Sequence, residues 1–196
     1  MLLGCAPKDP LSTDVVFEYA DNLEDAIGDF ETSRTSVSEN ISQSTQKVQT
    51  LLSTQSPNIR QVTKEWERNW RDAKNEFLDL EKNFSMVGNT SKQYFDKLEE
   101  INQNIDDKKI QKTEKARDEK LKATWTKTFK VASQSIQKLS DIIKKGDDFN
   151  MILLSASLRE KLIKNIDELK KIARISAVLL IKLEKLTIEG KKLIIK

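Results

Sequence analysis

The sequence contains no histidine, one cysteine, five glycines and three prolines in 196 residues. The absence of histidine excludes Ser-His-Asp and Cys-His catalysis, imidazole metal ligands and side-chain titration near neutral pH. The single cysteine excludes an internal disulfide. The sequence also lacks a glycine-rich phosphate loop, a Gly-x-Ser-x-Gly motif and a Cys-x-x-Cys pair. We therefore expect a protein that is not an enzyme, with no catalytic residues, no cofactor and no metal site.

The scarcity of glycine and proline also predicts the fold class. A β-rich domain needs a turn about every 8 to 12 residues, and glycine, proline or asparagine usually forms it. Gly4, Pro7 and Pro10 lie in the first ten residues, so few such residues remain for the rest of the chain. Lys, Glu and Gln, which favour helices, are frequent throughout. The composition therefore predicts an all-α protein.

Apolar side chains recur every 3.5 residues, in alternating steps of four and three, from Thr13 onward. In the first stretch this repeat runs from Val16 to Leu51, and Arg34 and Ser44 are its polar members. A period of 3.5 residues is typical of helices that pack along one another as in a coiled coil. The repeat predicts a first helix over about 13–53.

A second helix is predicted over about 57–105. Ser56 is a suitable N-cap, and Pro57 fits the first helical position because its missing N–H would have no partner there. The apolar repeat then continues in phase through Gly88, which indicates one helix rather than two. The aromatic residues Trp66, Trp70 and Phe77 fall on this repeat, and we interpret them as core rather than as an exposed binding groove.

Residues 106–120 are rich in charge and have almost no apolar side chains. They could form a charged hairpin tip with frayed helix ends or a solvated stretch of continuous helix, and we favour the hairpin. The apolar repeat resumes at Trp125 and stops at Lys144-Lys145-Gly146, a typical C-terminal helix signal. The third helix is therefore predicted over about 121–145.

The last helix is predicted over about 148–195, capped by Asp147 or Asp148, with a broad apolar stripe from Leu158 to Leu186. No apolar run in the chain is long enough to span a bilayer. Four long helices with short connections favour an elongated antiparallel bundle with up-down-up-down topology, formed as one domain by residues 13–196. If 106–120 were helical without a turn, the molecule would be a longer rod.

Charge is divided unevenly along the chain. Residues 1–100 carry 11 Lys and Arg against 18 Asp and Glu, and residues 101–196 carry 23 against 13, so the halves have net charges of −7 and +10. The basic half could bind an anionic surface, or the two halves could offset each other within one bundle, which we favour. Because its basic residues are mostly lysines without an arginine cluster, we do not expect nucleic-acid binding.

The N-terminus carries the most specific motif. Leu2-Leu3-Gly4-Cys5 resembles the lipobox of bacterial lipoproteins, in which the cysteine is acylated and becomes the mature N-terminus. Residues 1–12 would then form the lipidation motif and a tether, and Cys5 is the candidate lipidation site. The basic start and apolar run of a signal peptide are missing, so we expect these to lie upstream of Met1 in the gene.

The segment from Glu65-Trp66-Glu67 to Tyr94-Phe95-Asp96-Lys97-Leu98 and the apolar last helix resemble one family of small helical coiled-coil lipoproteins of bacteria with no assigned function. This resemblance implies a lipid on Cys5, attachment to the cell envelope facing the periplasm, and, because Ala6 follows the cysteine, the outer membrane. The protein would act there as a spacer or interaction scaffold. The alternative is a soluble cytoplasmic coiled-coil module that binds a partner helix or an anionic surface, or that forms a homo-oligomer.

Overall fold

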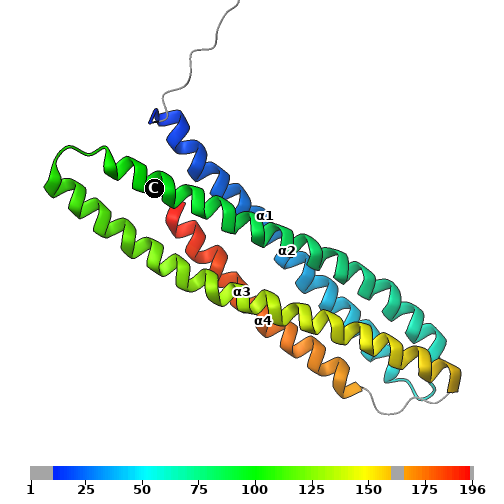
Figure 1. Ribbon diagram of the computed structural model, residues 1–196. Helices are drawn as coiled ribbons and strands as arrows, with labels where there is room; N and C mark the ends of the chain where they lie inside the picture. The colour runs from blue at the N-terminus through cyan, green and yellow to red at the C-terminus, as the bar shows by residue number, and fades with distance from the viewer. Residues whose placement is uncertain (1–10, 160–165, 195–196) are drawn as a thin grey trace, which may run out of the picture.

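The computed structural model describes residues 11–159 and 166–194. They form four long helices, α1 (Thr13–Leu52), α2 (Ile59–Gln103), α3 (Lys108–Arg159) and α4 (Ile166–Ile194). Successive helices run in opposite directions (Figure 1), and α1 and α3 each contact both α2 and α4. Among the described residues the backbones of α1 and α3 are not adjacent, so these two helices lie on opposite corners. The predicted all-α, up-down-up-down bundle is confirmed.

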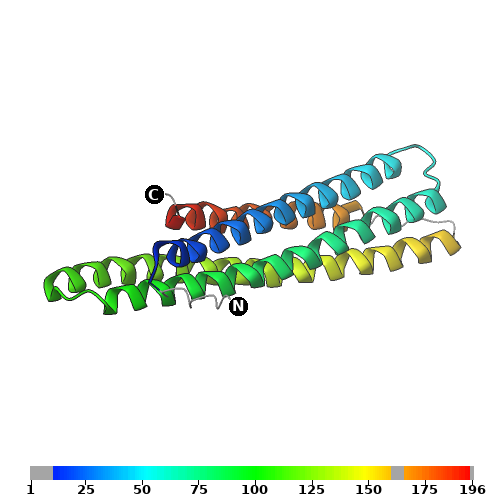
Figure 2. The ribbon, with the colours of Figure 1, turned by 90° about the horizontal axis from the view of Figure 1, so that it is seen from above.

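The bundle is elongated, as predicted. The turn between α2 and α3 extends past the start of α1 and the end of α4 in both views (Figures 1 and 2). At 1.5 Å per residue, the 52 residues of α3 span roughly 78 Å. The part of the α2–α3 hairpin that projects from the bundle is therefore a two-helix arm.

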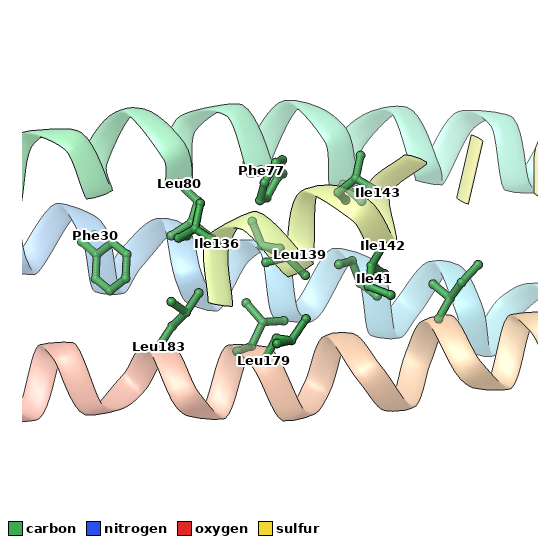
Figure 3. Close-up of a cluster of buried hydrophobic side chains, with 14 of the residues drawn as sticks. Phe30, Ile41, Phe77, Leu80, Ile136, Leu139, Ile142, Ile143, Leu179 and Leu183 are labelled. Carbon is green, nitrogen blue, oxygen red and sulfur yellow. The ribbon is translucent and has the colours of Figure 1, made fainter. Parts of the chain in front are cut away.

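Apolar side chains from all four helices meet along the bundle axis (Figure 3). The interior layers are formed by Phe30, Ile41, Phe77, Leu80, Ile136, Leu139, Ile142, Ile143, Leu179 and Leu183. The aromatic side chains of Trp66 and Trp70 are also buried, with exposures of 0% and 2%. The interpretation of the aromatic residues of α2 as core is therefore confirmed.

Gly88 and Gly146 both lie inside helices, although the sequence predicted a helix end at Gly146. Gly88 is within α2, as the continuous repeat predicted. Gly146 is within α3, so the predicted end of the third helix at residue 145 was wrong. A Cβ atom on Gly146 would lie 1.9 Å from the Trp70 ring, and the carbonyl of Gly146 accepts a hydrogen bond from Trp66 Nε1 at 3.0 Å. Gly146 thus allows α2 and α3 to approach closely and does not terminate a helix.

The predicted hairpin between the second and third helices is confirmed over a continuous helix, but its turn is shorter and lies earlier than 106–120. The chain reverses at 104–107, and α3 begins at Lys108 rather than near residue 121. The carboxylate of Asp107 accepts hydrogen bonds from the backbone N–H groups of Lys109 at 2.8 Å and Ile110 at 3.1 Å. These bonds satisfy the donors that a helix start leaves free, so a short turn is enough.

Two other helix starts differ from the prediction. The cap of α2 is Asn58 rather than Ser56, and its side chain accepts a hydrogen bond from the Gln61 N–H at 3.1 Å. α4 begins at Ile166 rather than residue 148, and the predicted caps Asp147 and Asp148 lie inside α3. Leu158 also belongs to α3, where it is 89% exposed instead of extending the apolar stripe of α4. The predicted helix over 160–165 lies outside the described residues.

Candidate functional site

The predicted lipidation site, Cys5, and the tether before Leu11 lie outside the described residues. Within 11–159 and 166–194, no helix is both long and apolar enough to cross a membrane. The same residues contain no group of three or more His, Cys, Asp or Glu side chains placed to hold a metal ion. The described chain therefore offers surface grooves and polar networks as candidate sites.

One groove lies on the projecting α2–α3 arm and has a volume of about 410 Å³. Phe95 forms its apolar floor and is 4% exposed. The ammonium group of Lys122 lies 6.0 Å from the centre of the Phe95 ring, a cation–π contact across the groove. The remaining lining residues are polar or charged: Glu99, Asn102, Gln103, Gln111, Lys115, Asp118 and Glu119.

Hydrogen bonds across this groove join α2 to α3. The Asn102 side chain is buried, and its Nδ2 donates to the Asp118 carboxylate at 2.6 Å. Gln111 Nε2 donates to the backbone carbonyl of Asn102 at 2.8 Å. The same carbonyl also accepts from the Ile105 N–H at 3.3 Å, so Gln111 adds a second donor at the C-terminal end of α2. The two bonds thus hold the arm together as a clasp between its helices.

Tyr94 marks the level at which the arm leaves the bundle. Its hydroxyl donates to the backbone carbonyl of Leu193, in the last turn of α4, at 3.1 Å. Burial raises the pKa of the Tyr94 hydroxyl, and the negative charge of Asp118 raises it further. The hydroxyl therefore stays protonated at neutral pH and serves as a donor that fixes the end of α4 against α2.

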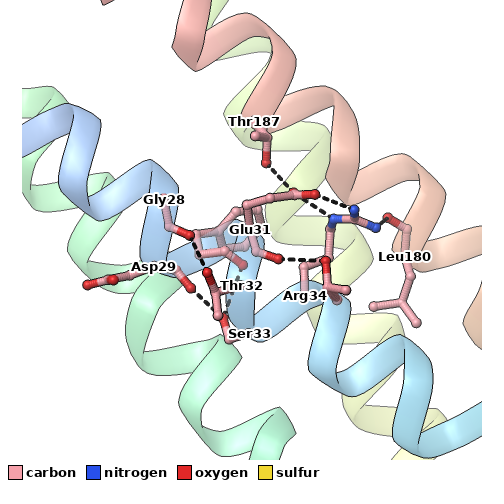
Figure 4. A network of polar contacts seen from close by, with 10 residues as sticks. Gly28, Asp29, Glu31, Thr32, Ser33, Arg34, Leu180 and Thr187 are labelled. Carbon is pink, nitrogen blue, oxygen red and sulfur yellow. Dashed lines mark hydrogen bonds and ion pairs between the residues drawn. The ribbon is translucent and has the colours of Figure 1, made fainter.

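A second polar network, half-buried, joins α1 to α4 (Figure 4). Arg34 Nε donates to the Glu31 carboxylate at 2.8 Å, and Thr187 of α4 donates to the same carboxylate at 2.8 Å. Arg34 also donates to the backbone carbonyl of Leu180 at 3.4 Å. Arg34, one of the polar members of the predicted repeat, is thus paired with Glu31 where the repeat faces the interior.

The Glu31 network predicts an acid-sensitive contribution to stability. The hydrogen bond from Arg34 lowers the pKa of the Glu31 carboxyl, and the bond from Thr187 lowers it further, although burial acts in the opposite direction. Because the pKa is lower in the folded state, the contribution is fully present above the ordinary value of 4.5 and is lost as the pH falls through the folded-state pKa.

We expect the substitution Glu31→Gln to reduce the free energy of unfolding at pH 7 by about 1–2 kcal/mol, because it removes the charge from the hydrogen bonds with Arg34 and Thr187. Urea denaturation at pH 7 and at pH 3.5 measures the effect. The loss should be smaller at the lower pH, where protonation weakens the wild-type network as well. The exposed Glu39→Gln is the matched control, and an equal effect of both substitutions would contradict the assignment.

The clasp residues Asn102, Gln111 and Asp118 were not found from the sequence. Asn102 is polar and nevertheless buried, and its hydrogen bond to Asp118 of α3 offsets the cost of removing its amide from water. The apolar repeat of α2 also shifts near its end, so that Phe95 is buried while Leu98 is half-buried. One signal in the sequence was Asp107, a residue type that caps helix starts. A helix that starts at Lys108 would have placed Gln111 and Asp118 opposite the end of the second helix.

Comparison of the chain with protein-family profiles, with curated proteins and with solved structures finds no match. The geometry of the described residues therefore defines the class of the molecule, an elongated up-down four-helix bundle with a projecting two-helix arm.

Proposed function

We propose that this protein is a non-enzymatic helical spacer and interaction scaffold of the bacterial cell envelope. In this proposal a lipid on Cys5 attaches it to the outer membrane, with the bundle facing the periplasm. The main support is the interior of the bundle. Apolar side chains from all four helices fill it along its length. A core of this kind gives a stiff rod, as a spacer requires.

The position of α1 determines how a lipid on Cys5 would orient the bundle relative to the membrane. Eight residue steps separate Cys5 from Thr13, the first residue of α1, and they can cover at most about 28 Å. The start of α1 lies toward the end of the bundle from which the α2–α3 arm projects (Figure 2). A lipid on Cys5 would therefore hold this end near the bilayer, and the turn between α1 and α2 would lie away from it.

Lipid labelling tests the proposal. The gene with its natural upstream sequence is expressed in a bacterium supplied with radiolabelled palmitate, beside a Cys5→Ala variant. We expect label and membrane association in the wild type and neither in the variant, with a mature peptide that begins at acylated Cys5. A peptide that begins at unmodified Met1 in a membrane-free fraction would overturn the proposal. That result would favour the soluble module, for which Met151, Leu154 and Leu158 offer an exposed apolar stripe.

A further inference from the structure

The two charge excesses of the chain lie on opposite corners of the bundle. α1 carries eight acidic and two basic side chains, for a net charge of −6, whereas α3 carries 13 basic and six acidic side chains, for a net charge of +7. Because α1 and α3 are separated by α2 and α4, these charges do not face each other within one molecule. The acidic hairpin α1–α2 packs beside the basic hairpin α3–α4, as the sequence analysis favoured, but the largest excesses, on α1 and α3, are not adjacent.

Five of the eight acidic side chains of α1 form one stripe. At 100° per residue, Leu23, Ile27 and Phe30 point into the core, and the acidic side chains of the stripe point to the opposite side. All of the stripe residues are exposed, and among the described residues none forms an ion pair. The acidic stripe consists of Asp14, Glu18, Asp21, Asp25 and Asp29.

Four of the 13 basic side chains of α3 form a matching stripe. Trp125, Ala132 and Leu139 point into the core, and four exposed lysines point away from it. No acidic residue lies between 120 and 138, and none of these lysines forms an ion pair within the described part of the chain. The basic stripe consists of Lys120, Lys127, Lys130 and Lys138.

We propose that the basic stripe of α3 binds the acidic stripe of α1 on a second copy of this chain, so that molecules associate side by side. The two stripes carry opposite charge and match in length, since 15 residue steps of α1 cover roughly 23 Å and 18 steps of α3 cover roughly 27 Å. Val131, which is 43% exposed, adds an apolar side chain within the basic stripe. Charge complementarity of this kind determines partner choice and orientation.

The position of the stripes fixes the type of assembly. Each contact uses a different surface on each copy, so the interface is heterologous rather than two-fold symmetric. A bound pair still exposes one acidic and one basic stripe at its two sides. The association therefore continues beyond a dimer as the concentration rises, which distinguishes it from a closed dimer. This inference depends on the bundle alone and does not require a lipid on Cys5.

Sedimentation velocity at several protein concentrations tests the inference. In about 20 mM salt we expect the average mass to rise steadily with concentration, and in about 500 mM salt we expect monomers, with an apparent association constant at least about tenfold lower, because salt screens exposed charges. A mass that stays monomeric in low salt would overturn the inference. A mass that stops at a dimer would also overturn it.

Charge reversal identifies the surfaces. K127E/K130E and D21K/D25K should each remain monomeric in low salt, and an equimolar mixture of the two should associate, because each variant then offers the partner that the other lacks. The control K64E/K82E makes the same charge change at exposed positions of α2 and should associate like the wild type. Failure of the mixture to associate, or an equal loss in the control, would contradict the proposed contact.

Anionic vesicles separate this proposal from membrane binding through the same lysines. Vesicles that contain phosphatidylglycerol are mixed with the wild-type protein in low salt and pelleted. We expect the protein to stay in the supernatant as oligomers. Recovery of monomers with the vesicles, abolished by K127E/K130E, would assign the basic stripe to lipid and overturn the self-association.

Discussion

Replacing Gly146 with alanine is expected to lower the free energy of unfolding by about 3 kcal/mol. The new methyl group would lie 1.9 Å from Cε2 and Cζ2 of Trp70, far inside van der Waals contact. The Trp70 ring is 2% exposed and stacks on Trp66 with a centroid distance of 4.6 Å, so it has no free space to move into. Urea denaturation monitored by circular dichroism gives the change.

Gly28→Ala is the matched control for this substitution. Gly28 is also inside a helix, but a Cβ atom there would meet nothing within 4 Å. Both substitutions gain the higher helix propensity of alanine, so the control should be stabilised by about 0.5–1 kcal/mol. The difference between the two variants isolates the steric effect at Trp70. Equal stability of the two variants would show that α2 and α3 are not in close contact at Gly146.

Trp66→Ala is expected to have the largest effect, a loss of about 3–5 kcal/mol. The side chain is fully buried, stacks on Trp70 and meets the edge of Phe149 at a centroid distance of 4.9 Å. Alanine would remove these contacts and the hydrogen bond from Trp66 Nε1 to the Gly146 carbonyl. Chemical denaturation and calorimetry measure the loss.

Two further variants serve as controls for Trp66→Ala. Trp66→Phe keeps an aromatic ring in the core and removes the indole N–H, so its loss should be clearly smaller than that of alanine. Leu78→Ala, at a side chain that is 62% exposed on the same helix, should change stability by less than about 0.5 kcal/mol. If Trp66→Ala were as mild as Leu78→Ala, the aromatic residues of α2 would form a surface and not the core.

The helices were predictable where the apolar repeat is dense. The first helix was predicted over 13–53 and is Thr13–Leu52, because its repeat runs without a break between clear ends. The apolar repeat continues in phase through Gly88, and it correctly predicted that α2 is one helix there. There a Cβ atom would lie 3.0 Å from the Phe129 ring, so this glycine also serves helix contact.

Helix ends were not predictable where the same local sequence occurs both at a helix end and inside a helix. Lys144-Lys145-Gly146 is typical of a helix end. A glycine also occurs inside a helix where a neighbouring indole ring packs so closely that a Cβ atom would not fit. That requirement depends on Trp70, 76 positions earlier in the chain, and no local pattern reveals it. The predicted break at Gly146 then displaced the end of α3 and the start of α4.

The polar contacts were the least predictable part of the molecule. The bond between Asn102 and Asp118 and the bond between Glu31 and Thr187 each join two helices, and their existence depends on the register between those helices. The sequence alone gave the charge of each half, yet the separation of the acidic and basic stripes follows from the order of the helices around the bundle. Exposed charges do not determine that order, because apolar burial dominates the packing.

Amide hydrogen exchange across Gly146, followed by NMR, tests most directly that α3 is one continuous helix packed against α2. The amides from Lys145 to Phe149 should exchange as slowly as the amide of Leu139, since they would open only with the bundle core. Exchange as fast as that of Thr54, in the turn between α1 and α2, would contradict this structure and restore a helix end at Gly146.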